Sequence, residues 1–210
     1  MEQHNKHIDD ISEIRMMMER ASKFISLSGL SGVMAGVFAF IGSAIAYWYL
    51  QIYLPKAQAP LLFKNLSLKD DATIFLLLLA MIIFLLAVLS GVFFTTRNSR
   101  KKKIPLWDHS SKKVLVNLFV PIFTGAVFIF YLIFKDIYVL IIPSSLIFYG
   151  LALINAGHFT YSDIKYLGYI EIFLGFLSLF FISLGLIIWT IGFGAMHIVY
   201  GILMFYKYEK

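Results

Sequence analysis

The stretch from Ala72 to Thr96 constrains the fold most, because it runs for 25 residues without one charged side chain. A helix that crosses the hydrocarbon core of a bilayer needs about 20 mostly apolar residues. Soluble domains have roughly 45–50% apolar and about 25% charged residues, whereas this chain has 60% hydrophobic and 14% charged residues. This composition excludes a soluble globular protein and a disordered chain, and it predicts an integral membrane protein.

The apolar stretches predict an all-α, polytopic membrane protein with six transmembrane helices. The last two come from one apolar run of 41 residues, Tyr166 to Tyr206, which is too long for one span. A turn is predicted within it at Ser183-Leu184-Gly185. Strands of a membrane barrel would alternate in polarity over about 10 residues, and these runs do not alternate. The predicted spans cover residues 25–53, 72–96, 114–134, 137–156, 166–182 and 186–206, with a tail at 207–210.

The loop from Arg97 to Lys113 sets the expected orientation. It holds seven basic residues and one acid, Asp108, so its charge of 7 − 1 = +6 equals the formal charge of the whole chain. Cytoplasmic loops carry the excess of Lys and Arg. We therefore expect a multi-pass membrane protein with both termini in the cytoplasm. A cleaved signal peptide is not expected, because the first apolar stretch is too long for one.

The same loop forms a cationic cluster beside the predicted membrane surface. One interpretation is a topology signal, and the other is a contact with anionic lipid headgroups, worth about 1 kcal/mol per basic residue. A short loop with one aromatic residue lacks the broad basic face that nucleic acids need, so no nucleic-acid partner is expected. The candidate lipid contacts are Arg97, Arg100, Lys101, Lys102, Lys103 and Trp107.

Residues 1–24 contain a predicted amphipathic helix. Asp10 and Glu13 have the spacing of a capping box, and apolar residues then recur every three or four positions at Ile11, Ile14, Met18, Ala21 and Ile25. The helix is expected to lie on the inner membrane surface. Two alternatives stay open for residues 10–25, namely a short coiled coil in a homo-oligomer and a docking helix for a cytoplasmic partner.

Ionisable residues inside the predicted spans are few. Glu171 is the only acid there and His197 the only histidine, and each is 13 residues from Leu184. In an antiparallel hairpin this places them at equal depth, where they could meet. A buried carboxyl group must take up a proton or find a partner. The pair is thus either a proton-linked or ligand-binding site or a hydrogen bond between helices. Other candidates are Asn155, Asn117 and Tyr200, with Tyr149 as a further hydroxyl.

Chemical motifs are absent from the sequence. The chain has no cysteine, and the HExxH, GxSxG and P-loop patterns do not occur. We therefore expect no catalytic residue, no metal and no cofactor. Glycines at Gly32 and Gly36 in the first span, and others in the last two, predict close packing of these helices. The second span is nearly all Leu, Ile and Phe and is expected to face lipid.

Both ends of the chain resemble one protein family. The opening stretch is Ala21-Ser22-Lys23-Phe24-Ile25-Ser26-Leu27-Ser28-Gly29-Leu30-Ser31-Gly32 with Ala35-Gly36, and the closing stretch includes Tyr166-Leu167-Gly168, Glu171, Leu174-Gly175, Trp189, Ile191-Gly192-Phe193-Gly194, His197 and Tyr200-Gly201. Together they resemble a family of uncharacterised small six-helix bacterial inner-membrane proteins. The resemblance implies that architecture and no particular activity.

Three functions remain open at this point. The first is a non-enzymatic membrane module that acts as a sensor, an accessory subunit or a partner-binding protein. The second is a small oligomeric transporter or channel in which Glu171 and His197 handle a proton or cation. The third is a membrane-embedded enzyme that acts on a lipid or quinone with the same pair.

Overall fold

The structure is a computed structural model, and it describes residues 27–53, 71–103, 105 and 107–210. The predicted amphipathic helix at residues 1–24, the partner-binding segment at 10–25 and most of the loop before Asp71 lie outside the described residues. The described part is helical and contains no strand, which confirms the all-α class. Its α-helices are α2 (Gly29–Tyr53), α3 (Asp71–Lys102), α4 (His109–Phe134), α5 (Ile141–Ala156), α6 (Ile164–Phe180), α7 (Gly185–Trp189) and α8 (His197–Tyr208).

Short helices of other types join these elements. Tyr138–Leu140 is a 3₁₀ helix, η2, before α5, and Ile182–Leu184 is a second one, η3, at the predicted turn of the last apolar run. Thr190–Met196 is a π-helix, η4, which links α7 to α8 without a break. The last span is therefore one long helix with a wider turn in its middle.

Five of the described helices are long and apolar enough to cross a membrane, judged by length and composition alone. They cover Gly29–Ile52, Asp71–Lys102, His109–Phe134, Tyr138–Ala156 and Ile182–Tyr208. Helix α6 has 17 residues, Ile164–Phe180, and is not among them. Several apolar helices indicate a membrane protein, while the count of six spans stays a prediction.

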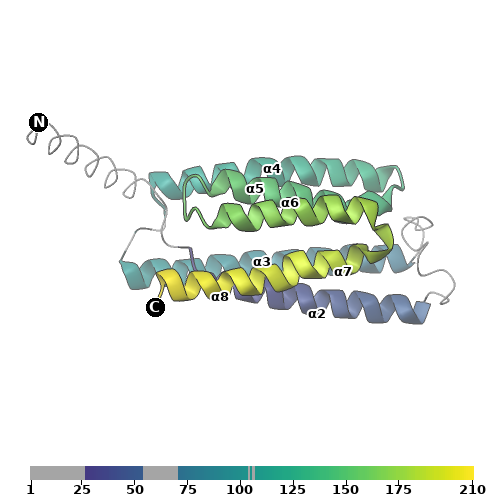
Figure 1. Ribbon diagram of the computed structural model, residues 1–210, viewed down its shortest axis with the longest axis horizontal. Coiled ribbons are helices and arrows are strands. Elements are labelled where there is room, and N and C mark those ends of the chain that lie inside the picture. The colour runs from purple at the N-terminus through teal and green to yellow at the C-terminus, as the bar shows by residue number, and fades with distance from the viewer. Residues whose placement is uncertain (1–26, 54–70, 104, 106) are drawn as a thin grey trace, which may run out of the picture.

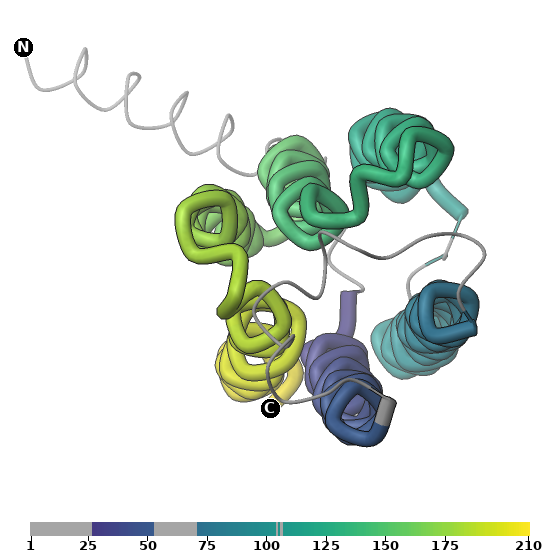
Figure 2. The backbone as a smooth tube through the Cα atoms, turned by 90° about the vertical axis from the view of Figure 1, so that its right-hand side faces the viewer, coloured from purple at the N-terminus to yellow at the C-terminus, as the bar shows by residue number. Residues whose placement is uncertain are grey.

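The helices form two layers that run along the same axis (Figures 1 and 2). One layer contains α4, α5 and α6, with α5 in the middle. The other contains α3, α2 and the α7–η4–α8 helix, with α2 in the middle. The chain crosses from the first layer to the second through η3, and α5 and α6 contact α7 and η4 there. The two layers thus meet along one edge, at the helices that carry Glu171 and His197.

Glycines allow the closest helix contacts within each layer. A Cβ atom at Gly150 of α5 would lie 2.6 Å from the carbonyl oxygen of Gly168 on α6, and one at Gly168 would lie 2.7 Å from the carbonyl oxygen of Gly150. In the other layer, a Cβ atom at Gly36 of α2 would lie 2.6 Å from the carbonyl oxygen of Gly194 in η4. Only residues without a side chain permit this approach.

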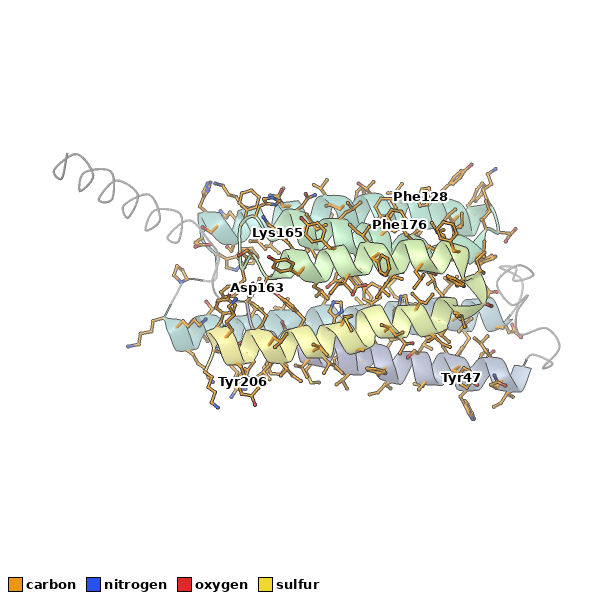
Figure 3. All side chains as sticks on the ribbon, viewed as in Figure 1. Tyr47, Phe128, Asp163, Lys165, Phe176 and Tyr206 are labelled. Atoms are coloured by element: carbon orange, nitrogen blue, oxygen red, sulfur yellow. The ribbon has the colours of Figure 1, made fainter. Side chains whose placement is uncertain are left out.

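Polar contacts join the helix ends at the end of the bundle that holds the carboxyl terminus. The side chain of Glu209 accepts from Ser28 Oγ at 3.1 Å and from the backbone N–H of Gly29, which begins α2. Asp108 and Ser111 form a capping box at the start of α4, in which the N–H of Ser111 donates to Asp108 Oδ1 at 2.6 Å. Figure 3 places Asp163, Lys165 and Tyr206 at this same end and Tyr47 at the opposite one.

Candidate functional site

Glu171 and His197 lie together where the two layers meet. Glu171 is in the middle of α6 and is fully buried, with no exposed surface. His197 is the first residue of α8, directly after the π-helix, and is 5% exposed. Its Nδ1 atom lies 3.4 Å from Glu171 Oε1. The structure thus brings the two residues into contact across the last helical hairpin.

The hydrogen bonds of the His197 imidazole show which of its two nitrogens always carries a hydrogen. Nδ1 of His197 lies 3.0 Å from the carbonyl oxygen of Gly192, and Nε2 lies 2.8 Å from the hydroxyl of Tyr149 on α5. A carbonyl oxygen only accepts hydrogen bonds, so Nδ1 carries a hydrogen and donates it. Neutral His197 then accepts at Nε2 from the Tyr149 hydroxyl, whereas a protonated imidazole donates from Nε2 to the tyrosine oxygen.

The carboxyl group of Glu171 makes no hydrogen bond in the described part of the chain. Neither Oε1 nor Oε2 has a hydrogen-bond partner among the described residues. Within that part of the chain, no other charged side chain forms an ion pair with Glu171 or His197. An isolated charge is expensive in such surroundings. The pair therefore favours a net-neutral state with one proton, held either by the carboxyl group or by the imidazole.

The space beside the carboxyl group is small. A Cβ atom at Gly192 would lie 2.6 Å from Glu171 Oε2 and 2.8 Å from a methyl group of Leu146. Leu146 is itself completely buried. On this side the site has no room for even a methyl group, so the ligand that fits beside Oε2 is a proton.

An aromatic row connects the site to the start of the last span. The ring centroids of Trp189 and Phe193 are 5.0 Å apart, and those of Phe193 and His197 are 5.7 Å apart. Tyr149 lies 5.0 Å from Phe193 and 5.3 Å from His197, measured between ring centroids. The imidazole is thus in contact with a row of rings that ends at Trp189, so a change in its protonation alters the surroundings of that row.

The π-helix is the part of the site that sequence reasoning missed. Its wider turn precedes His197 and leaves the carbonyl of Gly192 in reach of the imidazole. Insertions of this kind are rare in helices and frequent at functional sites. The only sequence signal is the Gly192-Phe193-Gly194 motif, which is equally typical of close helix packing.

The other predicted polar candidates do not join the site. Asn155 is exposed, and Asn117 donates from Nδ2 to the carbonyl oxygen of Lys113 in its own helix, at 2.8 Å. The hydroxyl of Tyr200 is buried without a hydrogen-bond partner among the described residues. Tyr200 lies one turn beyond His197 and packs against a cluster that includes Leu153 and Met204.

The basic residues separate onto two sides of α3. Arg97, Arg100, Lys101 and Lys103 are exposed. Lys102 is directed into the bundle end, where its Nζ donates to the hydroxyl of Tyr161 and to the carbonyl oxygen of Tyr208, each at 3.3 Å. Trp107 is 69% exposed.

Asp163 forms a polar contact between the layers at the same end of the bundle. It accepts from Lys207 Nζ at 2.6 Å and from the hydroxyl of Tyr208 at 2.9 Å. Burial raises the pKa of Asp163, but these two hydrogen bonds and the charge of Lys207 outweigh it and lower the pKa below its ordinary value. Burial, with the nearby Glu209 and Tyr208, raises the pKa of Tyr161 to about 12.

Comparison of the chain with protein-family models, with curated proteins and with solved structures found no match. The family resemblance of its two ends therefore stays a prediction.

Proposed function

We propose that this chain is a non-enzymatic, six-helix protein of the bacterial inner membrane that senses protons through Glu171 and His197. The observation that carries the proposal is the fully buried carboxyl group of Glu171, with neither oxygen hydrogen-bonded among the described residues and an imidazole nitrogen 3.4 Å from Oε1. Such a pair binds or releases a proton as a unit.

The position of the site supports a sensing role. Glu171 belongs to one layer, and His197 and Gly192 belong to the other. Loss of the proton leaves Glu171 as a buried carboxylate. The nearest donor, Nδ1 of His197, is already hydrogen-bonded to the carbonyl oxygen of Gly192. A buried charge is costly unless it gains a partner, so a change in protonation favours a change in the packing of α6 against the η4–α8 helix.

Proton-linked transport is the second candidate. It is favoured by the absence of hydrogen-bond partners for the Glu171 oxygens among the described residues, because a proton can then leave the carboxyl group without breaking an existing hydrogen bond. Proton flux in proteoliposomes that is lost in Glu171→Gln would establish transport and show that sensing is not the whole function.

Trp189 provides a direct test of sensing. The chain has three tryptophans, so Trp48→Phe with Trp107→Phe leaves Trp189 as the only one. We expect its emission, in detergent, to change reversibly between mildly acidic and mildly alkaline pH, because the aromatic row ends on His197. The change should disappear in Glu171→Gln and in His197→Asn added to this background.

His158 is the matched control for this experiment. Its Nδ1 also lies 3.0 Å from a backbone carbonyl oxygen, that of Ile154 in α5, but the side chain is exposed. The variant His158→Asn should therefore keep the full change in emission. Emission from Trp189 that does not depend on pH in the folded protein would contradict the proposal, and so would an unchanged response in Glu171→Gln.

The proposed topology has a separate test. Reporter fusions should place both termini and the loop from Arg97 to Lys113 in the cytoplasm, and the loop at Lys135 outside, because the basic loop holds the orientation. A carboxyl terminus on the outer side would contradict the six spans, since it requires an odd number of crossings.

A further inference from the structure

We propose that the outer face of α3 binds one anionic phospholipid, with the phosphate held by Arg97, Arg100 and Lys101. The proposal rests on the membrane insertion inferred above, and it is independent of the proton site. The three side chains are exposed and line an open hollow whose described lining belongs entirely to α3.

The spacing of the lining residues makes one continuous helix face. Leu89, Val92 and Phe93 form its apolar part, and Thr96 leads from it to the basic part. Along the chain, the lining residues follow one another in alternating steps of three positions and one position. This spacing keeps side chains on one side of an α-helix. The face therefore runs from an apolar end to a cationic end along a single line.

The length of α3 places this change of character at the membrane surface. The helix has 32 residues and is about 48 Å long at the ordinary helical rise, whereas the hydrocarbon core is about 30 Å thick. If residues 72–96 cross the core, the next turn carries the basic residues into the headgroup layer. A phospholipid has the same order of parts, with acyl chains below a charged phosphate.

The apolar part of this face is available for acyl chains. Leu89, Val92 and Phe93 are 65%, 60% and 62% exposed. α3 packs mainly on α2. The neighbouring polar residues Asn98 and Lys102 are at least partly buried and make contacts within the protein, because Asn98 donates to the carbonyl oxygen of Leu27 at 3.1 Å and Lys102 to Tyr161 and Tyr208.

The charges on the outer face fit an anionic headgroup. Among the described residues, no acidic side chain forms an ion pair with Arg97, Arg100 or Lys101. Arginine suits phosphate because its planar donors bind two oxygens at once. A lipid is favoured over a free anion because the cationic residues continue an apolar face of the same helix.

Native mass spectrometry of the full chain in a non-ionic detergent, with added phosphatidylglycerol, tests this assignment. A basic residue near an anionic surface contributes about fivefold in affinity, so Arg97→Gln/Arg100→Gln/Lys101→Gln should weaken binding by about 100-fold. The matched control, Lys112→Gln/Lys113→Gln/Lys165→Gln, removes the same charge from helices α4 and α6 at the same end of the bundle (Figure 3). It leaves this face intact and should weaken binding by less than about threefold.

Several outcomes would overturn the proposal. Equal losses in the two triple variants would show diffuse attraction to the basic end of the bundle, and no loss in either would show that the face binds no anionic lipid. Displacement of the lipid by an equal concentration of inorganic phosphate would assign the basic residues to a free anion. If the triple variant does not accumulate, the single variants Arg97→Gln, Arg100→Gln and Lys101→Gln should each lose about fivefold. An unchanged Trp189 titration in these variants keeps this test separate from the proton site.

Discussion

Helices α3 and α5 differ in a way that hydrophobicity alone does not explain. In the most apolar part of α3, 6% of the residues are buried within the bundle, whereas the share is 39% in the segment Tyr138–Ala156, which contains α5. The buried residues of α3 are Thr73, Asn98 and Ser99, all polar and close to its ends. Helix α5 instead buries Pro143, Ser144, Leu146, Gly150, Ala152, Leu153 and Ala156 along its length.

The difference shows that small residues decide which helices pack together. In a membrane the lipid is as apolar as a leucine side chain, so association depends on close packing and polar contacts rather than on hydrophobicity. Helix α5 has Gly150 against Gly168, and it contributes the Tyr149 hydroxyl to the site. Helix α3 has large apolar side chains along its middle and leaves them exposed.

Glycine substitutions should give the largest contrast between the two regions. Gly150→Ala should destabilise the protein by about 3 kcal/mol, at the upper end for an overpacked core, because the added methyl group meets the backbone of α6. Gly91→Ala in α3 is the control, since a Cβ atom there has no neighbour within 4 Å, and it should stabilise by about 0.5–1 kcal/mol. Thermal unfolding in detergent measures both, and equal losses would mean that the two helices are packed alike.

The polar site should give the next largest effect. Glu171→Gln and His197→Ala should each destabilise by about 1–3 kcal/mol. The first buries an amide group with no hydrogen-bond partner among the described residues, and the second leaves the Tyr149 hydroxyl without its partner His197. Their combination should cost less than the sum of the single losses, as expected for residues in contact. Thermal unfolding of the four proteins measures the coupling. A coupling free energy near zero would show that the two side chains are not in contact and would contradict the site described at the junction of the layers.

The contact between Asp163 and Lys207 should give the smallest effect. Since its pKa is lowered in the folded protein, Asp163 stabilises the fold fully above its ordinary pKa, and this contribution is lost as the pH falls through the lowered value. Exposed ion pairs are worth about 0–1 kcal/mol, so Asp163→Asn should lower stability slightly near neutral pH. The difference from the unchanged protein should shrink in strong acid. A difference that grows in acid would reverse the assigned sign.

Much of the fold could be predicted from the sequence, because apolar length sets the helices. The helical class and the break after α6 follow from the pattern. The ends of the helices differ from the ends of the predicted spans where polar residues continue a helix. α3 extends past Thr96 to Lys102, and α4 begins at His109, directly after its N-cap Asp108. Hydropathy marks the hydrocarbon core, whereas backbone hydrogen bonds mark the helix.

The site could be predicted only in part. Equal distances from Leu184 place Glu171 and His197 at one depth, but depth does not determine which way a side chain faces. The π-helix sets the facing of His197, and the partners Tyr149 and Gly192 depend on how α5 and η4 pack. These features arise from tertiary contacts, and no local residue pattern specifies them.

Infrared difference spectroscopy of the purified protein tests the central claim that Glu171 and His197 hold one proton between them. A protonated carboxyl group has a C=O stretching band that a carboxylate lacks. We predict one such band that titrates reversibly with pH, disappears in Glu171→Gln and titrates at a different pH in His197→Ala. The exposed-histidine variant His158→Asn should leave it unchanged. A carboxyl band that titrates identically in His197→Ala would contradict the claim. A folded protein in which neither a carboxyl band nor an imidazolium band changes with pH would contradict it as well.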